Sequence, residues 1–78
     1  MQFKLYSSEG CHLCEQAFEL CQQADIANVV EIIDIVDDEK LVELYGISIP
    51  VLENIATAQK LFWPFTLKQI TEQIEQSK

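Results

Sequence analysis

Apolar and polar residues alternate at the start of the chain and then change period. The alternation over residues 2–7 predicts a strand, and residues 7–10 are expected to form a loop. From Cys11 the apolar residues recur at helical spacing, so we expect a helix that ends near Ala24. The buried stripe of this helix is predicted to consist of Cys14, Ala17, Phe18 and Cys21.

A second strand and a short helix are predicted in the middle of the chain. Residues 29–36 are rich in β-branched side chains, which is typical of an interior strand covered on both faces. Asp37 or Asp38 can cap the N-terminus of the short helix that follows. We expect Gly46 to end this helix in the left-handed conformation.

The next segment has the pattern of an antiparallel hairpin. Pro50 opens a strand over residues 51–53, where a missing N–H is tolerated. Residues 54–59 are expected to turn the chain, and residues 60–63 to return antiparallel until Pro64 ends the strand.

A C-terminal helix completes the predicted order β-α-β-α-β-β-α, an α/β arrangement. Thr66 and Gln69 have the spacing of a capping box, and Phe65 and Ile70 that of a hydrophobic staple. The buried stripe of the helix is predicted to be Leu67, Ile70 and Ile74.

Length and charge limit the fold and the partners. With 78 residues the chain has room for one hydrophobic core, so residues 1–78 are expected to form a single domain. We expect this domain to be a monomer. A formal net charge of −8 opposes binding to nucleic acid and to anionic membrane surfaces. The apolar runs are too short to cross a membrane. We therefore exclude nucleic acids and membranes as expected partners.

The cysteines indicate a reducing compartment. Cys11, Cys14 and Cys21 are odd in number and closely spaced, unlike the spread disulfide framework of a secreted protein. The first residues also lack the continuous apolar stretch of a signal peptide. We therefore expect a cytoplasmic location, with thiols that are redox-active or bind metal.

Cys11 and Cys14 lie where the first strand leads into the first helix. Two thiols three residues apart on an opening helical turn can close a disulfide with little backbone movement. The free N–H groups and the positive dipole end of the helix favour a thiolate at Cys11. Cys14, one turn inside the helix, would be shielded and placed to resolve a mixed disulfide at Cys11. Two buried, inert thiols are the alternative interpretation.

Neighbouring residues each admit two interpretations. A protonated His12 would stabilise the Cys11 thiolate and tune the pair, whereas the alternative is a solvent-facing loop residue without this effect. Glu9 and Glu15 would oppose a nearby thiolate. Cys21 lies on the apolar stripe and is interpreted as a core residue, with a regulatory or metal-binding role as the alternative.

The Ile49–Pro50 bond precedes a strand that can receive a substrate. A cis bond would leave the backbone of Ile49 unpaired and facing outward, where it can bind an extended substrate as an added strand. A trans proline that opens an edge strand is the commoner arrangement.

The order of elements, the dithiol after the first strand and the Ser48-Ile49-Pro50 step together resemble the thioredoxin superfamily. The compact form is similar to glutaredoxins and, more closely, to the uncharacterised glutaredoxin-like domains of bacteria. The resemblance implies a thioredoxin-like, glutaredoxin-type fold: a four-stranded mixed sheet with helices on both faces. It also implies that Cys11 is the nucleophile, Cys14 the resolving thiol and Pro50 a cis-proline beside them.

The residues that bind glutathione in glutaredoxins are replaced in this chain. Glutaredoxins usually carry Pro-Tyr between the thiols and a Lys three residues before the nucleophile, where this chain has His12-Leu13 and Ser8. Their Gly-Gly-x-Asp segment corresponds to residues 63–66, whose bulky rings hinder the approach of a ligand to the backbone. We therefore expect no bound cofactor and consider glutathione only as a reductant. Thr66, at a helix N-terminus, is predicted to offer an anion site.

The leading hypothesis is a thiol–disulfide oxidoreductase that reduces protein or small-molecule disulfides through Cys11 and Cys14. Its expected partners are a protein disulfide and a reductant of unknown kind, and its substrate contacts are predicted at Ile49, Pro50 and Thr66. Two alternatives stay open. One is a metal or iron–sulfur carrier with Cys11 and Cys14 as ligands, whose closed site needs Cys21, His12, a second protomer or a small thiol. The other is a non-catalytic binding module that docks partners through the Pro50 edge and the Trp63-Phe65 surface.

Overall fold

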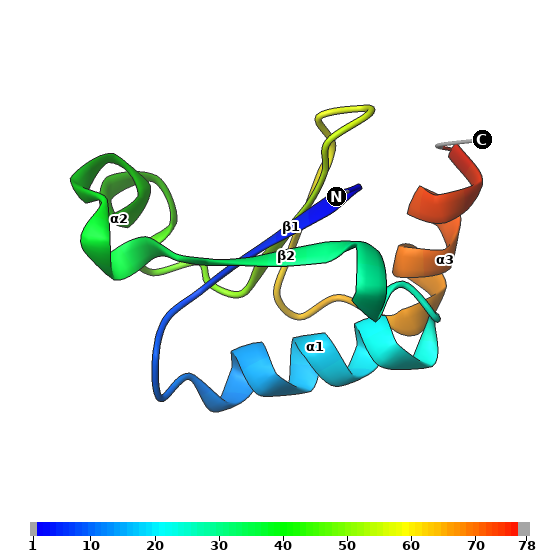
Figure 1. The fold of residues 1–78 in the computed structure, drawn as a ribbon, viewed down its shortest axis with the longest axis horizontal. Helices are drawn as coiled ribbons and strands as arrows, with labels where there is room; N and C mark the ends of the chain where they lie inside the picture. Colours follow the sequence, from blue (N-terminus) through cyan, green and yellow to red (C-terminus); the bar gives the residue numbers. More distant parts are fainter. Residues whose placement is uncertain (1, 77–78) are drawn as a thin grey trace.

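The chain folds into a four-stranded sheet with three α-helices. This computed structural model describes residues 2–76. Figure 1 shows α1 running alongside the sheet, with α2 and α3 toward opposite ends of the view. The elements follow the predicted order: β1 (Phe3–Ser7), α1 (His12–Gln23), β2 (Val30–Asp34), α2 (Glu39–Tyr45), β3 (Val51–Asn54), β4 (Lys60–Phe62) and α3 (Leu67–Gln76). None of the helices within this range is long and apolar enough to cross a membrane.

The sheet is mixed, and its strand order is β2-β1-β3-β4. β1 pairs in parallel with β2 and antiparallel with β3, and β3 pairs antiparallel with β4. The expected interior strand over residues 29–36 is therefore wrong in position and length, because β2 covers only Val30–Asp34 and lies at the edge. Turns of 3-10 helix flank it on both sides. A β-branched run favours extended backbone, but long-range pairing decides which strand is covered.

Side chains that alternate along the strands build a core on each face of the sheet. Phe3 and Leu5 of β1 pack in one cluster with side chains of α1 and α3, including Ala17 and Ile70. Tyr6, which points the other way, packs in a second cluster with Val51, Ile35 and Tyr45 of α2. Helices therefore cover both faces, as the resemblance implied.

Polar side chains start two of the helices as predicted. Oδ1 of Asp38 accepts hydrogen bonds from the N–H groups of Lys40 and Leu41, at 2.9 and 3.3 Å, at the start of α2. The Thr66–Gln69 capping box is present, since each backbone N–H donates to the other residue's side-chain oxygen.

Gly46 ends α2, but not in the predicted left-handed conformation. Its φ is −51° and its N–H donates to the carbonyl of Val42 at 2.8 Å, so the right-handed turn continues. A Cβ at this position would lie 2.5 Å from the Val42 carbonyl oxygen. Close backbone approach, rather than a left-handed turn, is therefore the reason for a glycine here.

The buried stripe of α3 also differs from the prediction. Ile70 is buried and Ile74 partly buried, but Leu67 is 36% exposed, and Gln73 lies in the stripe instead. Polar contacts accompany its burial: its backbone carbonyl accepts from Nδ2 of the buried Asn54 at 3.2 Å. Its Nε2 donates to Oε1 of Gln59 at 2.8 Å. A hydrophobic pattern alone cannot reveal a buried residue of this kind.

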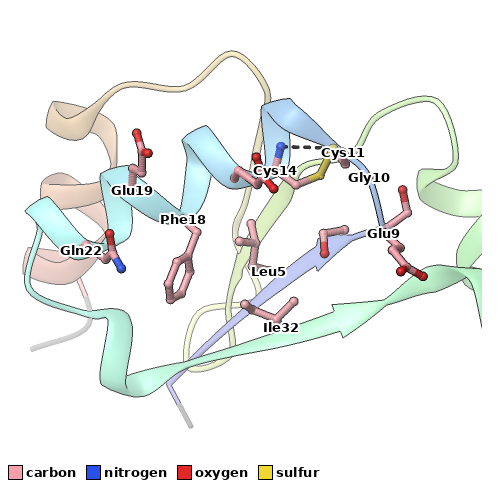
Figure 2. A pocket seen from close by; sticks show the side chains of 12 residues that line it. Leu5, Glu9, Gly10, Cys11, Cys14, Phe18, Glu19, Gln22 and Ile32 are labelled. Carbon is pink, nitrogen blue, oxygen red and sulfur yellow. Dashed lines mark hydrogen bonds between the residues drawn. A yellow bond between two sulfur atoms is a disulfide. The ribbon is translucent and has the colours of Figure 1, made fainter.

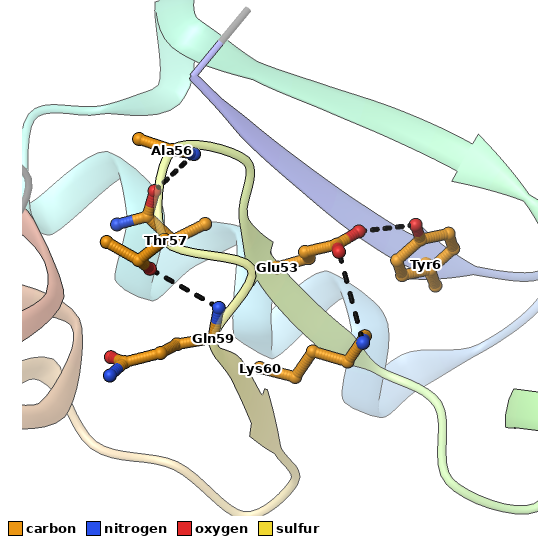
Figure 3. Close-up of polar contacts among 7 residues, drawn as sticks. Tyr6, Glu53, Ala56, Thr57, Gln59 and Lys60 are labelled. Carbon is orange, nitrogen blue, oxygen red and sulfur yellow. Dashed lines mark hydrogen bonds and ion pairs between the residues drawn. The ribbon is translucent and has the colours of Figure 1, made fainter.

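Polar contacts tie β1, β3 and β4 together on the face that α2 covers (Figure 3). The Tyr6 hydroxyl donates to Oε1 of Glu53 at 2.6 Å, and Lys60 Nζ lies 4.0 Å from Oε2 of the same carboxylate. The Tyr6 ring stacks on Tyr45, with ring centroids 4.6 Å apart. Burial, followed by the bond to Glu53, raises the pKa of Tyr6 above its usual range.

Candidate functional site

A tight turn carries the chain from β1 into α1. The N–H of Cys11 donates to the carbonyl of Ser8 at 3.3 Å, which closes the turn. Gly10, within it, has a φ of +78°, a conformation that residues with a Cβ rarely adopt. The turn places Cys11 at the N-cap of α1, with extended backbone, as the strand-to-helix junction in the sequence predicted.

Cys11 and Cys14 are joined by a disulfide within the first turn of α1 (Figure 2). Their Cα atoms are 5.2 Å apart, within the usual range for a disulfide. The N–H of Cys14 donates to Sγ of Cys11 at 3.1 Å. Cys11 is partly exposed, whereas Cys14 is only 6% exposed. The predicted shielding of Cys14 relative to Cys11 is therefore confirmed for the whole residues.

Charges near the pair act in opposite directions. The N-terminus of α1 and the Cys14 N–H favour negative charge on the Cys11 sulfur. The carboxylates of Glu9 and Glu15 oppose it, because both residues lie with the dithiol around a groove that runs along α1. The His12 side chain is 90% exposed, and its Nδ1 lies 3.6 Å from Oε2 of Glu15. The predicted tuning of the dithiol by His12 stays a prediction.

Cys21 is separate from the dithiol. It is fully buried in the cluster beneath α1, which confirms its predicted core position. Burial raises the pKa of its thiol to about 11, so it is protonated at neutral pH. A protonated, inaccessible thiol is a poor nucleophile.

The sheet brings the predicted substrate-binding segments to the end that carries the dithiol. Tyr6 near the end of β1 pairs with Val51 at the start of β3, and Val51 pairs with Phe62 at the end of β4. The residues just before β3 and just after β4 therefore lie at the same sheet end as the turn into α1. The Ile49–Pro50 bond is cis, as the resemblance implied. A second cis bond, Trp63–Pro64, was not predicted.

Two details of these segments change the expected contacts. The Ile49 N–H donates to the carbonyl of Tyr45 at 3.0 Å, so the expectation of an unpaired Ile49 backbone is wrong for its donor. Residues 46–49 continue the turn of α2, and this brings the Ile49 N–H to the carbonyl of Tyr45. The addition of an extended substrate as a strand at Ile49 therefore depends on the Ile49 carbonyl as a hydrogen-bond acceptor. At Thr66 the capping box engages the N–H groups of Thr66 and Gln69, so the predicted anion site depends on the amides between them.

A groove of about 450 Å³ extends from the dithiol along α1 and was not predicted. Leu5, Phe18 and Ile32 give it an apolar lining, and glutamates lie among the other lining residues (Figure 2). Phe18 was assigned to the core stripe and Ile32 to a covered strand. The groove depends on β2 being an edge strand, and no local pattern in a single sequence signals that.

Among the described residues there is no cluster of three or more His, Cys, Asp or Glu that could hold a metal ion.

Comparison with solved structures supports the fold. The X-ray structure of target protein XcR50 from X. campestris is 33% identical, with a TM-score of 0.85, over 97% of this chain and 99% of that chain. The solution structure of the same protein is also 33% identical, with a TM-score of 0.87, over 100% of this chain and 97% of that chain. Thioredoxin 1 from Thermosipho africanus TCF52B is 14% identical, with a TM-score of 0.70 over 97% of this chain and 92% of that chain. This last likeness shows a thioredoxin fold and nothing beyond it.

Sequence comparison identifies the family. No curated protein matches the chain. The family described as Glutaredoxin-like domain (DUF836) matches residues 2–75, which is nearly the whole chain. The dithiol with its Cys-x-x-Cys spacing and the elements that carry it all lie within this range. The chain therefore belongs to the glutaredoxin-like domain family, and it has a thioredoxin fold.

Proposed function

We propose that the protein is a thiol–disulfide oxidoreductase in which Cys11 attacks and Cys14 resolves. One observation carries the proposal: the partly exposed Cys11 and the buried Cys14 are joined by a disulfide at the N-terminus of α1, and the Cys14 N–H donates to Sγ of Cys11 at 3.1 Å. A hydrogen bond to sulfur at a helix N-terminus stabilises a thiolate, the form that attacks disulfides. Membership of the glutaredoxin-like family agrees with this chemistry.

The reaction has two exchange steps. The Cys11 thiolate attacks one sulfur of the substrate disulfide, forms a mixed disulfide and releases the other substrate sulfur as a thiolate, which takes up a proton. Cys14 then loses its proton and attacks Sγ of Cys11, which releases the second substrate thiol. Two electrons pass to the substrate, and the protein is left with the Cys11–Cys14 disulfide. An external thiol reductant restores the dithiol by the reverse exchange.

Substrate contacts are proposed at the sheet end that carries the dithiol. There the Ile49 carbonyl can accept a hydrogen bond from an extended substrate, with Pro50 beside the sulfur pair and Thr66 at the start of α3. In a reducing compartment such as the cytoplasm, where we place the chain, the net direction is reduction. Ser8 and residues 63–66 replace the usual glutathione contacts, which favours a dithiol reductant over glutathione.

Turnover tests the proposal. The protein is added in catalytic amount to a disulfide-linked peptide with dithiothreitol as reductant, and the initial rate of peptide reduction is measured. We expect wild type to accelerate the reaction and Cys11→Ser to reduce it to the uncatalysed rate. Cys21→Ala, with the dithiol intact, should retain most of the acceleration. Equal acceleration by wild type and Cys11→Ser would contradict the proposal.

A further inference from the structure

The groove beside the dithiol is lined by residues of α1, of β1 and of the edge strand β2. Ile32 of β2 pairs in register with Leu5 of β1, and both line the groove. Leu5 is buried, whereas Ile32 is 54% exposed, although its strand neighbour Val30 packs in the core on the α1 side. Alternation along β2 puts Ile32 on that same side. An apolar side chain on a helix-covered face is thus left open to solvent in the groove.

The length of the groove suits an extended chain. Its lining along α1 begins at Cys11 and continues to Gln22, which at the rise of an α-helix corresponds to about 16 Å. Extended polypeptide advances about 3.3 Å per residue, so roughly five residues fit beside the helix. A segment next to a substrate cysteine that reacts at Cys11 can therefore continue into the groove.

The charge of the groove selects the kind of segment. Glu9, Glu15 and Glu19 line it, and no Lys, Arg or His is among the described residues that do. Glu15 lies near His12, whereas no ion pair with a described basic residue involves Glu9 or Glu19. The whole chain carries a net charge of −8, so no long-range field of opposite sign offsets these carboxylates. Anionic ligands are repelled and cationic side chains attracted.

We infer that this groove binds the segment of a polypeptide substrate adjacent to its disulfide, with an apolar side chain against Phe18 and Ile32 and a Lys or Arg beside Glu19. The inference rests on the proposed oxidoreductase function and adds the substrate class: basic, apolar-anchored protein disulfides. Steering by the glutamates raises the rate of encounter, and this contribution weakens as salt increases.

Paired peptides provide the test. Two disulfide peptides share a sequence with one apolar residue next to the cysteine, and they differ only in having Lys or Glu at the following two positions. Reduced protein is mixed with each peptide at low salt, and the single-turnover rate of the first exchange is followed by acid quench and mass spectrometry. We expect the Lys peptide to react about tenfold faster, with the ratio falling as salt is added.

Matched variants localise the effect. Glu19→Lys should abolish or reverse the preference, whereas Glu43→Lys, the same charge change on α2, should keep it within about twofold. Ile32→Ser should slow the Lys peptide, whereas Ile55→Ser, at a similarly exposed residue (45%) in the β3–β4 turn, should not. Equal rates for the two peptides, or equal losses with Glu19→Lys and Glu43→Lys, would overturn the inference.

Two controls separate this inference from the proposed function. Reduction of hydroxyethyl disulfide, which is small and uncharged, reports on the dithiol alone. Equilibrium binding of the two peptides in non-reducible form to the Cys11→Ser/Cys14→Ser variant reports on the groove alone. Stronger binding of the Lys peptide without any reduction would reject the oxidoreductase and support the groove. Reduction of hydroxyethyl disulfide together with equal binding of both peptides would support the oxidoreductase and reject the groove as a substrate site.

Discussion

The backbone N–H of Cys14 points at the sulfur of Cys11, with 3.1 Å between nitrogen and Sγ. The contact exists because Cys11 is the N-cap of α1. Its side chain accepts from the N–H of the residue three positions later in the chain, as a capping Ser or Asp would. The sulfur is thus held where the helix has unsatisfied donors. The same bond that caps the helix also stabilises negative charge on the sulfur.

This contact predicts the order in which the reduced thiols react. With iodoacetamide at pH 7, Cys11 should be alkylated at least about 100-fold faster than Cys21, because Cys21 is buried and protonated. The shielded Cys14 should react more slowly than Cys11. Peptide mapping after brief labelling measures the order. In urea the three rates should converge, and persistence of the order there would show that the fold does not cause it.

Burial of Cys21 predicts a pH dependence of stability. Its pKa rises from the ordinary 9.0 to about 11 in the folded state. Below pH 9 the thiol is protonated in both states, and from about pH 9 to 11 it ionises mainly in the unfolded chain. Ionisation there stabilises the unfolded state, so the free energy of unfolding falls by about 2–3 kcal/mol as pH rises through that window.

Urea unfolding at pH 8 and pH 11 measures this loss. The Cys11→Ser/Cys14→Ser background removes disulfide exchange from the experiment. Adding Cys21→Ala should lower stability at pH 8 but remove the extra loss at high pH, because the variant has no thiol there to ionise. An equal loss of stability with and without Cys21 would contradict the assignment.

In the β3–β4 turn, Ala58 has a backbone conformation that is unfavourable for a residue with a Cβ. Ala58 has a φ of +60°, where a Cβ is strained, and its N–H closes the turn on the Asn54 carbonyl at 2.8 Å. Ala58→Gly should raise the free energy of unfolding by about 0.5–1 kcal/mol, since relief of strain exceeds the added freedom of the unfolded chain. Ala56→Gly, in the same turn, is the matched control and should not stabilise. Thermal unfolding distinguishes the two.

Local signals were sufficient for most of the fold. The first helix, the Asp38 cap and the Thr66–Gln69 capping box follow from residues within a few positions of one another, so their pattern can be interpreted in one sequence. The dithiol is local for the same reason: its spacing and its place after a strand are enough to put both sulfurs on one helical turn. The cis bond at Pro50 could be expected only from the family resemblance.

Features that depend on distant contacts were not predictable in this way. β2 contains the residues of a covered strand but is placed at the sheet edge, which leaves Ile32 exposed and opens the groove. Gln73 is buried because residues of the β3–β4 turn and strand lie close enough to bond it. The Ile49 N–H is taken by a carbonyl of the preceding helix, so the expected free donor is absent.

The most direct test of the account is covalent trapping with Cys14→Ser. The reduced variant is mixed with a disulfide peptide, quenched with acid and examined by intact-mass and peptide-mapping mass spectrometry. We expect a stable mixed disulfide at Cys11, because no second thiol in reach can displace the peptide, whereas wild type should release the peptide as a free thiol. Absence of an adduct, or an adduct on Cys21 in place of Cys11, would contradict the assignment of Cys11 as the attacking thiol.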